Sequence, residues 1–125
     1  MVDRVKDEEF QNQKAVIQWW AYAHRGYGLP EFALMAYPAG GLRTKATAGK
    51  LKAQGARAGI PDMSLPLAKG GFGGLVIELK SSVGRTSPIQ REVLAWFESI
   101  GWRAVVCRSA DAAMREIKAY LGARP

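Results

Sequence analysis

The chain of 125 residues contains one cysteine, one histidine and no long apolar run, and each of these absences excludes a class of protein. The single cysteine, Cys107, allows no internal disulfide, so we expect a reducing compartment such as the cytoplasm. The single histidine, His24, leaves no Cys/His zinc site and no pair of histidines for acid–base catalysis. No apolar run approaches the roughly 20 residues of a membrane span, and the N-terminus lacks the basic-then-apolar order of a signal peptide.

Acidic residues are also scarce, and the imbalance of charge is local. The chain has 18 basic and 11 acidic residues, which give a net charge of +7. Between positions 43 and 69 the only acid is Asp62, whereas the basic residues are Arg43, Lys45, Lys50, Lys52, Arg57 and Lys69. Such a stretch predicts a polyanionic partner, with a merely solubilising surface as the alternative.

Apolar spacing and helix-end residues predict four helices. Residues 4–24 carry apolar side chains at helical spacing and end at glycines. A basic helix is expected over 44–53, and a last helix over 110–121 behind Ser109. Ser87-Pro88-Ile89-Gln90 has the form of a capping box with proline at the first helical position. The helix that follows ends at Gly101, and its apolar stripe consists of Ile89, Val93, Trp96, Phe97 and Ile100.

Four strands are expected, over 32–37, 62–67, 75–80 and 102–107. The glycine-rich segment 69–74 predicts an antiparallel hairpin between the second and third strands, although Pro66 places the second at an edge or makes it fray there. A turn centred near residue 70 pairs residues whose numbers sum to about 140, which puts Asp62 opposite Glu78. The strand–helix–strand order from Leu75 to Cys107 implies parallel strands. Together these elements predict one α/β domain over residues 1–125.

The third strand carries two charges where apolar residues are expected. Side chains alternate along a strand, so Val76, Glu78 and Lys80 share one face. Burying a glutamate and a lysine is costly without partners, and this cost suggests a chemical role. The alternatives are a plain ion pair on an edge strand for Glu78 and Lys80, and a turn cap for Asp62.

These charges suit metal-assisted phosphodiester cleavage. Directly opposed strand residues have Cβ atoms about 4.5–5.5 Å apart, so Asp62 and Glu78 are expected to share one divalent cation. The backbone carbonyl of Leu79 is a further oxygen ligand, and Lys80 is placed to orient water or to stabilise negative charge.

Three more residues are candidates for the same site. Glu9 and Gln13 lie one turn apart on the first helix, and they would meet the metal directly or through water. Gln90 joins them if it faces the sheet. The alternatives are that Glu8 replaces Glu9, that Gln13 is a surface residue, and that Gln90 only completes the capping box.

The ordered set of motifs resembles the VRR-NUC family of the PD-(D/E)xK nuclease superfamily. The matching pieces run in family order over roughly residues 8–121: Glu9 with Gln13, Lys52-Ala53-Gln54-Gly55, Gly59-Ile60-Pro61-Asp62, Gly74 to Lys80, Ser87 to Gln90, and Gly101 to Arg108. One departure is Pro38-Ala39-Gly40-Gly41, where many relatives carry Pro-Asn-Gly-Gly. The short chain is similar to stand-alone members of phage or prophage type.

The resemblance implies a restriction-endonuclease-like core, a mixed sheet flanked by helices, and Mg²⁺- or Mn²⁺-dependent cleavage of DNA. It assigns metal ligation to Asp62, Glu78 and the Leu79 carbonyl, with Lys80 catalytic and with Glu9 and Gln90 as accessory residues. It also implies a homodimer acting on structured DNA such as four-way junctions, in bacterial or phage-infected cytoplasm. The expected DNA contacts are Arg43, Lys45, Lys50, Lys52, Arg57, Lys69 and Arg85. The alternative is a non-catalytic DNA-binding module of the same fold.

Overall fold

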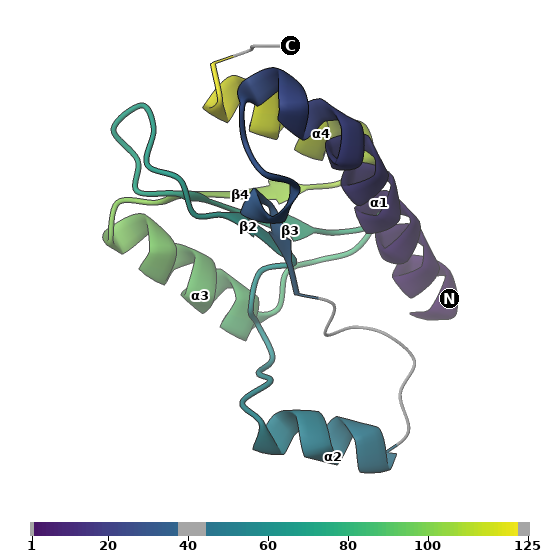
Figure 1. Ribbon diagram of the computed structural model, residues 1–125. Coiled ribbons are helices and arrows are strands. Elements are labelled where there is room, and N and C mark those ends of the chain that lie inside the picture. The colour runs from purple at the N-terminus through teal and green to yellow at the C-terminus, as the bar shows by residue number, and fades with distance from the viewer. Residues whose placement is uncertain (1, 38–44, 123–125) are drawn as a thin grey trace.

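A four-stranded mixed sheet forms the centre of the computed structural model, which describes residues 2–37 and 45–122 (Figure 1). The sheet order is β1-β2-β3-β4. β2 pairs antiparallel with both β1 and β3, whereas β3 and β4 are parallel. The strands are β1 (Met35–Ala36), β2 (Met63–Leu65), β3 (Leu75–Leu79) and β4 (Arg103–Cys107). This arrangement confirms the expected α/β class with a mixed sheet.

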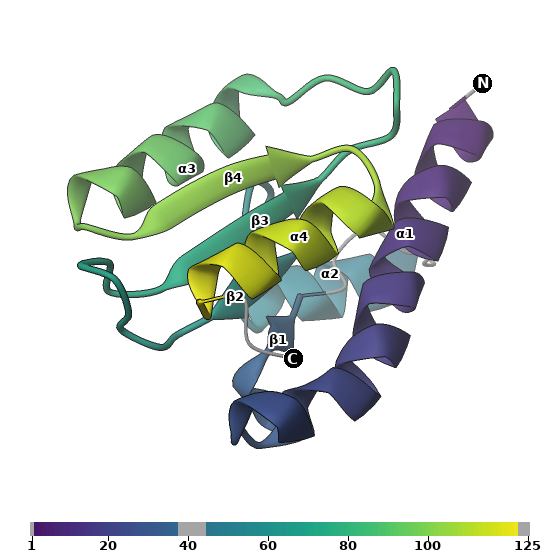
Figure 2. The same cartoon turned by 90° about the horizontal axis from the view of Figure 1, so that it is seen from above.

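Helices cover both faces of the sheet (Figures 1 and 2). α1 (Val2–Ala23) and α4 (Ala110–Tyr120) lie on one face, and α3 (Pro88–Ser99) lies on the other. α2 (Lys45–Ala53) stands apart from the sheet on the side of α3. Within the described residues, no helix combines the length and the apolar character that a membrane crossing requires.

The main core lies between the sheet and the pair α1/α4. Leu75, Ile77 and Leu79 point into it and pack with residues such as Trp20 and Ile117, all nearly inaccessible to solvent. Val76 and Glu78 are equally buried but lie outside this cluster, on the face toward α3. The alternation expected for the strand is therefore confirmed, and it places the Glu78 side chain under α3.

The hairpin register agrees with the sequence expectation. Met63 pairs with Ile77 and Leu65 with Leu75, so the paired residue numbers sum to 140. Continuing this register by one residue puts Asp62 opposite Glu78, on the same face. Pro66 follows the last residue of β2, and the strand ends there because proline cannot donate to the ladder. β2 is an internal strand, so fraying rather than an edge position explains this proline.

The expected strand over 32–37 is wrong for its first half. Residues Glu31–Ala33 form a 3₁₀ turn, in which the Ala33 N–H donates to the Pro30 carbonyl, and only Met35–Ala36 are strand. Proline fixes the backbone angle that starts such a turn, and the three-residue β2 leaves little strand to pair with. The first helix also begins earlier than expected and continues as a 3₁₀ turn over His24–Tyr27. The helix over 44–53 is confirmed from Lys45 onward; Arg43, Thr44 and the motif at 38–41 lie outside the described residues.

The apolar stripe of α3 does not face the sheet as one unit. Leu94 is the buried residue of this helix, and the Phe97 ring packs on Trp102 with centroids 5.2 Å apart. Ile89, Trp96 and Ile100 are 41%, 56% and 48% exposed. The capping box is confirmed in both directions, since the Ser87 hydroxyl accepts from Gln90 N–H and the Gln90 side chain accepts from Ser87 N–H.

Candidate active site

Two carboxyl groups meet at the end of the β2–β3 hairpin. One carboxylate oxygen of Asp62, Oδ2, accepts the Leu79 N–H at 2.7 Å, and the carboxyl groups of Asp62 and Glu78 lie within hydrogen-bonding reach of each other. The N–H and C=O of one strand residue point to the same side, so the Leu79 carbonyl lies on the β2 side of β3, as its N–H does. The structure therefore brings Asp62 and Glu78 together, as the hairpin register predicted.

The two oxygens of Glu78 have different surroundings. Oε2 accepts from Gln90 Nε2 at 3.1 Å and lies 3.8 Å from Lys80 Nζ. Oε1 is buried and has no hydrogen-bond donor among the described residues. A buried carboxylate oxygen without a donor is destabilising by about 1–3 kcal/mol or more, so it calls for a proton or a cation.

Burial disfavours the charged forms of Asp62 and Glu78. Loss of solvent, and then the nearby Asp62 carboxylate, raises the pKa of Glu78 to about 8, against the opposing effect of Lys80. Burial also raises the pKa of Asp62, although the Leu79 N–H opposes the shift. Without a cation the two groups share a proton, because both charges together are too costly at this distance.

A divalent cation fits these residues. The unpartnered Glu78 oxygen, the Asp62 carboxylate and the Leu79 carbonyl are hard oxygen donors of the kind that Mg²⁺ and Mn²⁺ bind. The described residues contain no cluster of three His, Cys, Asp or Glu side chains placed to hold a metal together. Protein donors beyond the carboxylate pair would therefore be backbone carbonyls or uncharged side chains, with water completing the shell.

Glu9 lies beside the pair but has its own partner. Its Oε2 accepts the Ser81 N–H at 3.2 Å, and its charge contributes to raising the pKa values of both Asp62 and Glu78. Glu8 accepts the exposed Ser82 N–H at 2.7 Å instead. Of the two alternatives, Glu9 is therefore the one whose charge reaches the carboxylate pair. Gln13 is half-buried on α1, and its side chain forms no hydrogen bond within the described residues.

Comparisons with known proteins agree with this geometry. The sequence model of the VRR-NUC domain matches residues 3–111. This chain belongs to the VRR-NUC family. A solved structure described as a VRR_NUC domain protein is 28% identical and superposes with a TM-score of 0.74, over 92% of this chain and 90% of that one. No curated protein matches the chain.

Membership of the VRR-NUC family gives the chain a nuclease-type function with DNA as the substrate. Nucleases of this family generally depend on divalent metal ions, which agrees with the donor set at the carboxylate pair.

The loop after Lys80 is held from two sides in this VRR-NUC domain. Glu8 and Glu9 of α1 accept its amides, while Arg108 Nη1 donates to the carbonyls of Ser81 and Gly84 at 3.0 and 2.5 Å. Arg108 was quoted in the sequence analysis only as the end of a motif. The position of an arginine directly after a strand does not indicate its hydrogen-bond partners, so this role could be found only in the structure.

Tyr37 and Gly59 position the segment that leads to Asp62, and neither was predicted from the sequence for this role. The Tyr37 N–H donates to the Asp62 carbonyl at 2.7 Å, and its hydroxyl accepts the Arg57 N–H at 2.9 Å. Gly59 has a φ of +88°, and a Cβ there would lie 2.8 Å from Ile89 Cγ1. Its place in the motif Gly59-Ile60-Pro61-Asp62 was the one available signal.

The expected DNA contacts fall into three groups. Lys45, Lys50 and Lys52 are exposed on α2, and Arg57 is exposed on the segment after it. Arg85 is exposed in the loop between Lys80 and α3. Lys69 lies at the turn of the hairpin, at the opposite end of β2 and β3 from Asp62 and Glu78. Arg43 lies outside the described residues.

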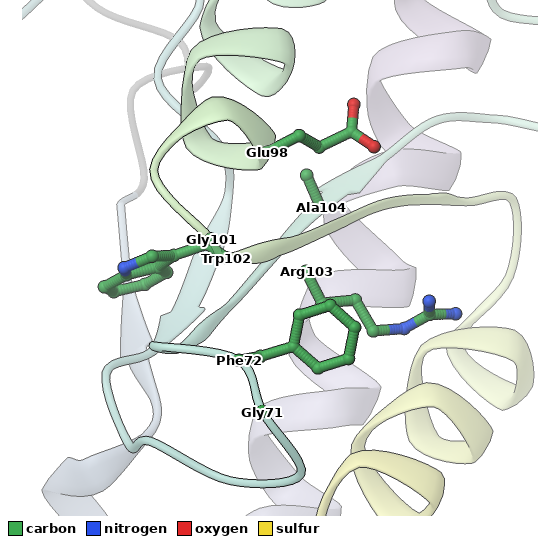
Figure 3. Close-up of a pocket in the computed structure, with 7 residues that line it drawn as sticks. All are labelled: Gly71, Phe72, Glu98, Gly101, Trp102, Arg103 and Ala104. Atoms are coloured by element: carbon green, nitrogen blue, oxygen red, sulfur yellow. The ribbon is translucent and has the colours of Figure 1, made fainter.

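A pocket of about 260 Å³ lies at that opposite end of the sheet (Figure 3). Phe72 and Trp102 line it with Glu98 and Arg103, and Arg103 binds Glu116 through two hydrogen bonds of 3.0 and 3.2 Å. Neither of the paired carboxyl groups, Asp62 and Glu78, lines this pocket.

The remaining reactive side chains are structural. Cys107 is buried, and loss of solvent raises the pKa of its thiol to about 11, which keeps it protonated and unreactive at neutral pH. A ring nitrogen of His24, Nδ1, lies 2.7 Å from the Leu29 carbonyl, at the end of the first helix.

Proposed function

We propose that this chain is a Mg²⁺- or Mn²⁺-dependent endonuclease that hydrolyses phosphodiester bonds of branched DNA, such as four-way junctions, in the cytoplasm of a bacterial or phage-infected cell. The observation that supports it most is the buried Oε1 of Glu78, which belongs to a carboxyl group beside Asp62 and has no hydrogen-bond donor in the part of the chain that the structure describes. A site built for structure alone would satisfy that oxygen. The choice of four-way junctions as the substrate rests on the family resemblance. Family membership supports the action on DNA.

Asp62, Glu78 and the Leu79 carbonyl would hold the cation, with Glu9 acting through water. When bound, the cation polarises the phosphate and lowers the pKa of water. Lys80, 3.8 Å from Glu78, orients the attacking water and stabilises negative charge that develops on the phosphate. Gln90 keeps the Glu78 carboxylate in one orientation through its 3.1 Å hydrogen bond. The exposed basic residues hold the DNA backbone.

The proposal includes a homodimer, supported by the exposed side of α3. Ile89, Val93, Trp96 and Ile100 follow one another at spacings of four, three and four residues, the seam of a helix that packs on another helix. Ile89, Trp96 and Ile100 are each at least 41% exposed in one protomer. A two-fold dimer would bury this seam against its own copy and present two sites to the arms of a junction.

The test is a cleavage assay of purified protein with Mg²⁺, with Mn²⁺ and with EDTA. The substrates are a four-way junction, a flap, a single strand and a linear duplex. We expect metal-dependent cleavage, greatest on the junction. Asp62→Asn, Glu78→Gln and Lys80→Met should each lower the rate by a factor of at least about 100, the order of magnitude lost with one charge-stabilising group.

Matched controls separate the enzyme from contaminants and from misfolding. Each variant should keep the wild-type circular dichroism spectrum and bind the junction in EDTA. Substitution of Asp111, an exposed acid in the first turn of α4, to Asn should leave cleavage unchanged. Junction binding by the wild type without cleavage of any substrate in either metal would instead identify a non-catalytic DNA-binding module.

A further inference from the structure

α2 contributes almost nothing to the packed interior. None of its nine residues is buried; eight are exposed and Leu51 is half-buried. Figure 1 shows the helix set apart from the sheet. Isolated helices of fewer than about 12 residues are marginal in water, so neither propensity nor packing accounts for this element. Its role must lie outside the folding of a single protomer.

The charge of α2 has one sign. Lys45, Lys50 and Lys52 are exposed, and the next cation along the chain is Arg57. No acid occurs between Lys45 and Pro61. Its other residues are mostly alanine, glycine and threonine, which are short enough to let a helix approach a flat or grooved surface. A polyanion with closely spaced charges is the complementary partner.

The end of α2 is structurally defined. Gly55 has a φ of +105°, its N–H donates to the Lys52 carbonyl, and the Ala56 N–H donates to the Leu51 carbonyl. These two bonds form a Schellman motif, which ends a helix in a fixed direction. The chain therefore leaves the helix along one path toward Arg57.

The segment that follows α2 is connected by hydrogen bonds to the candidate active site. The Tyr37 hydroxyl accepts the Arg57 N–H, and the Tyr37 N–H donates to the Asp62 carbonyl. Gly59 packs against the backbone of Ile89, next to Gln90, which reaches Glu78. α2 thus emerges on the side of the sheet that Glu78 faces.

From these contacts we infer that α2 is an arm that binds the phosphate backbone of a DNA segment beyond the one being cut. This inference rests on the proposed function for the identity of the cut segment, but not for the binding itself. The arm contributes affinity through Lys45, Lys50 and Lys52, while Tyr37 is a positioning residue that fixes its direction. In a branched substrate, the arm and the site then engage different portions of the DNA.

The experiment compares two full-length triple variants with the same net charge. The arm variant replaces Lys45, Lys50 and Lys52 with Gln, a good helix former. The control variant replaces Lys14, Arg25 and Arg115 with Gln, all exposed and located on α1, the 3₁₀ turn after it and α4. Each variant loses three positive charges from +7 and keeps +4. Binding of a labelled four-way junction is measured in EDTA over a range of salt concentrations.

We expect the arm variant to bind on the order of tenfold more weakly, with the slope of log affinity against log salt reduced by about one per lost lysine. The control variant should keep its slope. In Mg²⁺ the arm variant should need more enzyme for half-maximal cleavage, and Tyr37→Phe should show part of that increase. Equal affinities and slopes for the two triple variants would overturn the inference.

Further outcomes separate this inference from the proposed function. If the wild type cleaves DNA but the arm variant binds like the control, the inference about α2 is wrong and the proposed nuclease function is retained. If no DNA is cleaved but only the arm variant loses DNA binding, the proposed nuclease function is wrong and the inference about α2 is retained. A changed sedimentation coefficient of the arm variant, with unchanged DNA binding, would assign α2 to contacts between copies and overturn the inference.

Discussion

The Gln90 side chain joins the start of α3 to the Glu78 carboxylate. Its Oε1 accepts the Ser87 N–H at 2.8 Å, and its Nε2 donates to Glu78 Oε2 at 3.1 Å. The capping box and the site were alternatives in the sequence analysis, but one amide serves both because its two ends have opposite hydrogen-bonding character. The position of α3 and the orientation of Glu78 are therefore set by the same residue.

Gln90→Glu separates the two roles. A glutamate still accepts the Ser87 N–H and suits a helix N-terminus, but it loses the donor to Glu78 and adds a negative charge there. We expect a folded protein whose cleavage rate falls by a factor of about 10–100, the cost typical of a lost supporting contact at a metal site. The measurement is initial cleavage rate against Mg²⁺ concentration.

Ser87→Ala is the matched control for that variant. It removes the hydroxyl cap and leaves the Gln90–Glu78 contact in place. The free energy of unfolding should drop by about 1 kcal/mol, the usual value of an N-cap, while cleavage persists. A large loss of cleavage in Ser87→Ala would show that the cap, not the donor to Glu78, is what the site needs.

The metal-free protein should lose stability as the pH rises. Burial and the Asp62 carboxylate raise the pKa of Glu78 from 4.5 to about 8. Between these two values the folded state holds more protons than the unfolded state, so the free energy of unfolding falls with increasing pH. The stabilising effect of the shared proton is complete below pH 4.5 and is lost through about pH 8.

Urea unfolding of wild type and Glu78→Gln in EDTA tests this. The uncharged variant should show a flatter pH profile and should be the more stable of the two at about pH 8.5, since it has no charge to bury. Addition of Mg²⁺ should stabilise the wild type at that pH more than the variant. A wild-type profile that rises over the same interval would contradict the raised pKa.

Gly59→Ala should displace the segment that carries Asp62. The new methyl group would meet Ile89 Cγ1 at 2.8 Å and the Ile89 backbone at 3.2 Å, and the φ of +88° is unfavourable for alanine. Strain and overpacking each cost about 1–3 kcal/mol, so we expect a lower melting temperature and weaker Mg²⁺-dependent cleavage.

Gly28→Ala provides the comparison for Gly59. Gly28 has a φ of +69°, but a Cβ there would meet nothing within 4 Å. The Gly28→Ala variant should therefore lose only about 1 kcal/mol of stability, the cost of a positive φ for alanine, and should cleave DNA normally. Equal destabilisation by the two substitutions would rule out the contact with Ile89 as the reason for the glycine.

Trp96→Glu should prevent dimer formation. The Trp96 side chain is 56% exposed in the protomer, at the middle of the α3 seam, and a carboxylate there cannot be buried against a second copy without a partner. Sedimentation velocity should show a dimer for the wild type and a monomer for the variant. Tyr22→Glu changes a 78% exposed residue on α1 and should leave the dimer intact. A monomeric wild type would refute the seam as an interface.

The hairpin and its carboxylate pair could be predicted because local rules determine them. A symmetrical turn near residue 70 fixes the register, and a period of two then fixes the faces of Asp62, Glu78 and Lys80. The capping box is equally local, since Ser87 and Gln90 are three residues apart. In each case the interacting residues are close together in the sequence, so no packing between distant segments is needed to predict them.

Contacts between distant segments were not predictable in the same way. The choice of Glu9 over Glu8 depends on which side of α1 meets Ser81, 72 positions later. The α3 stripe was predicted as apolar, but helical spacing alone cannot tell a core face from a seam for another chain. The partners of Arg108 and Tyr37 likewise depend on loop paths that no periodicity describes.

The contact between Glu9 and Ser81 bears on how a nuclease of this kind is made inside a cell full of DNA. The carboxylate pair is available as soon as the hairpin forms, but α3 must dock before Gln90 can orient Glu78, and the N-terminal helix must dock before Glu9 arrives. We therefore expect a partly folded chain, in which either helix has not yet packed, to hold an incomplete site.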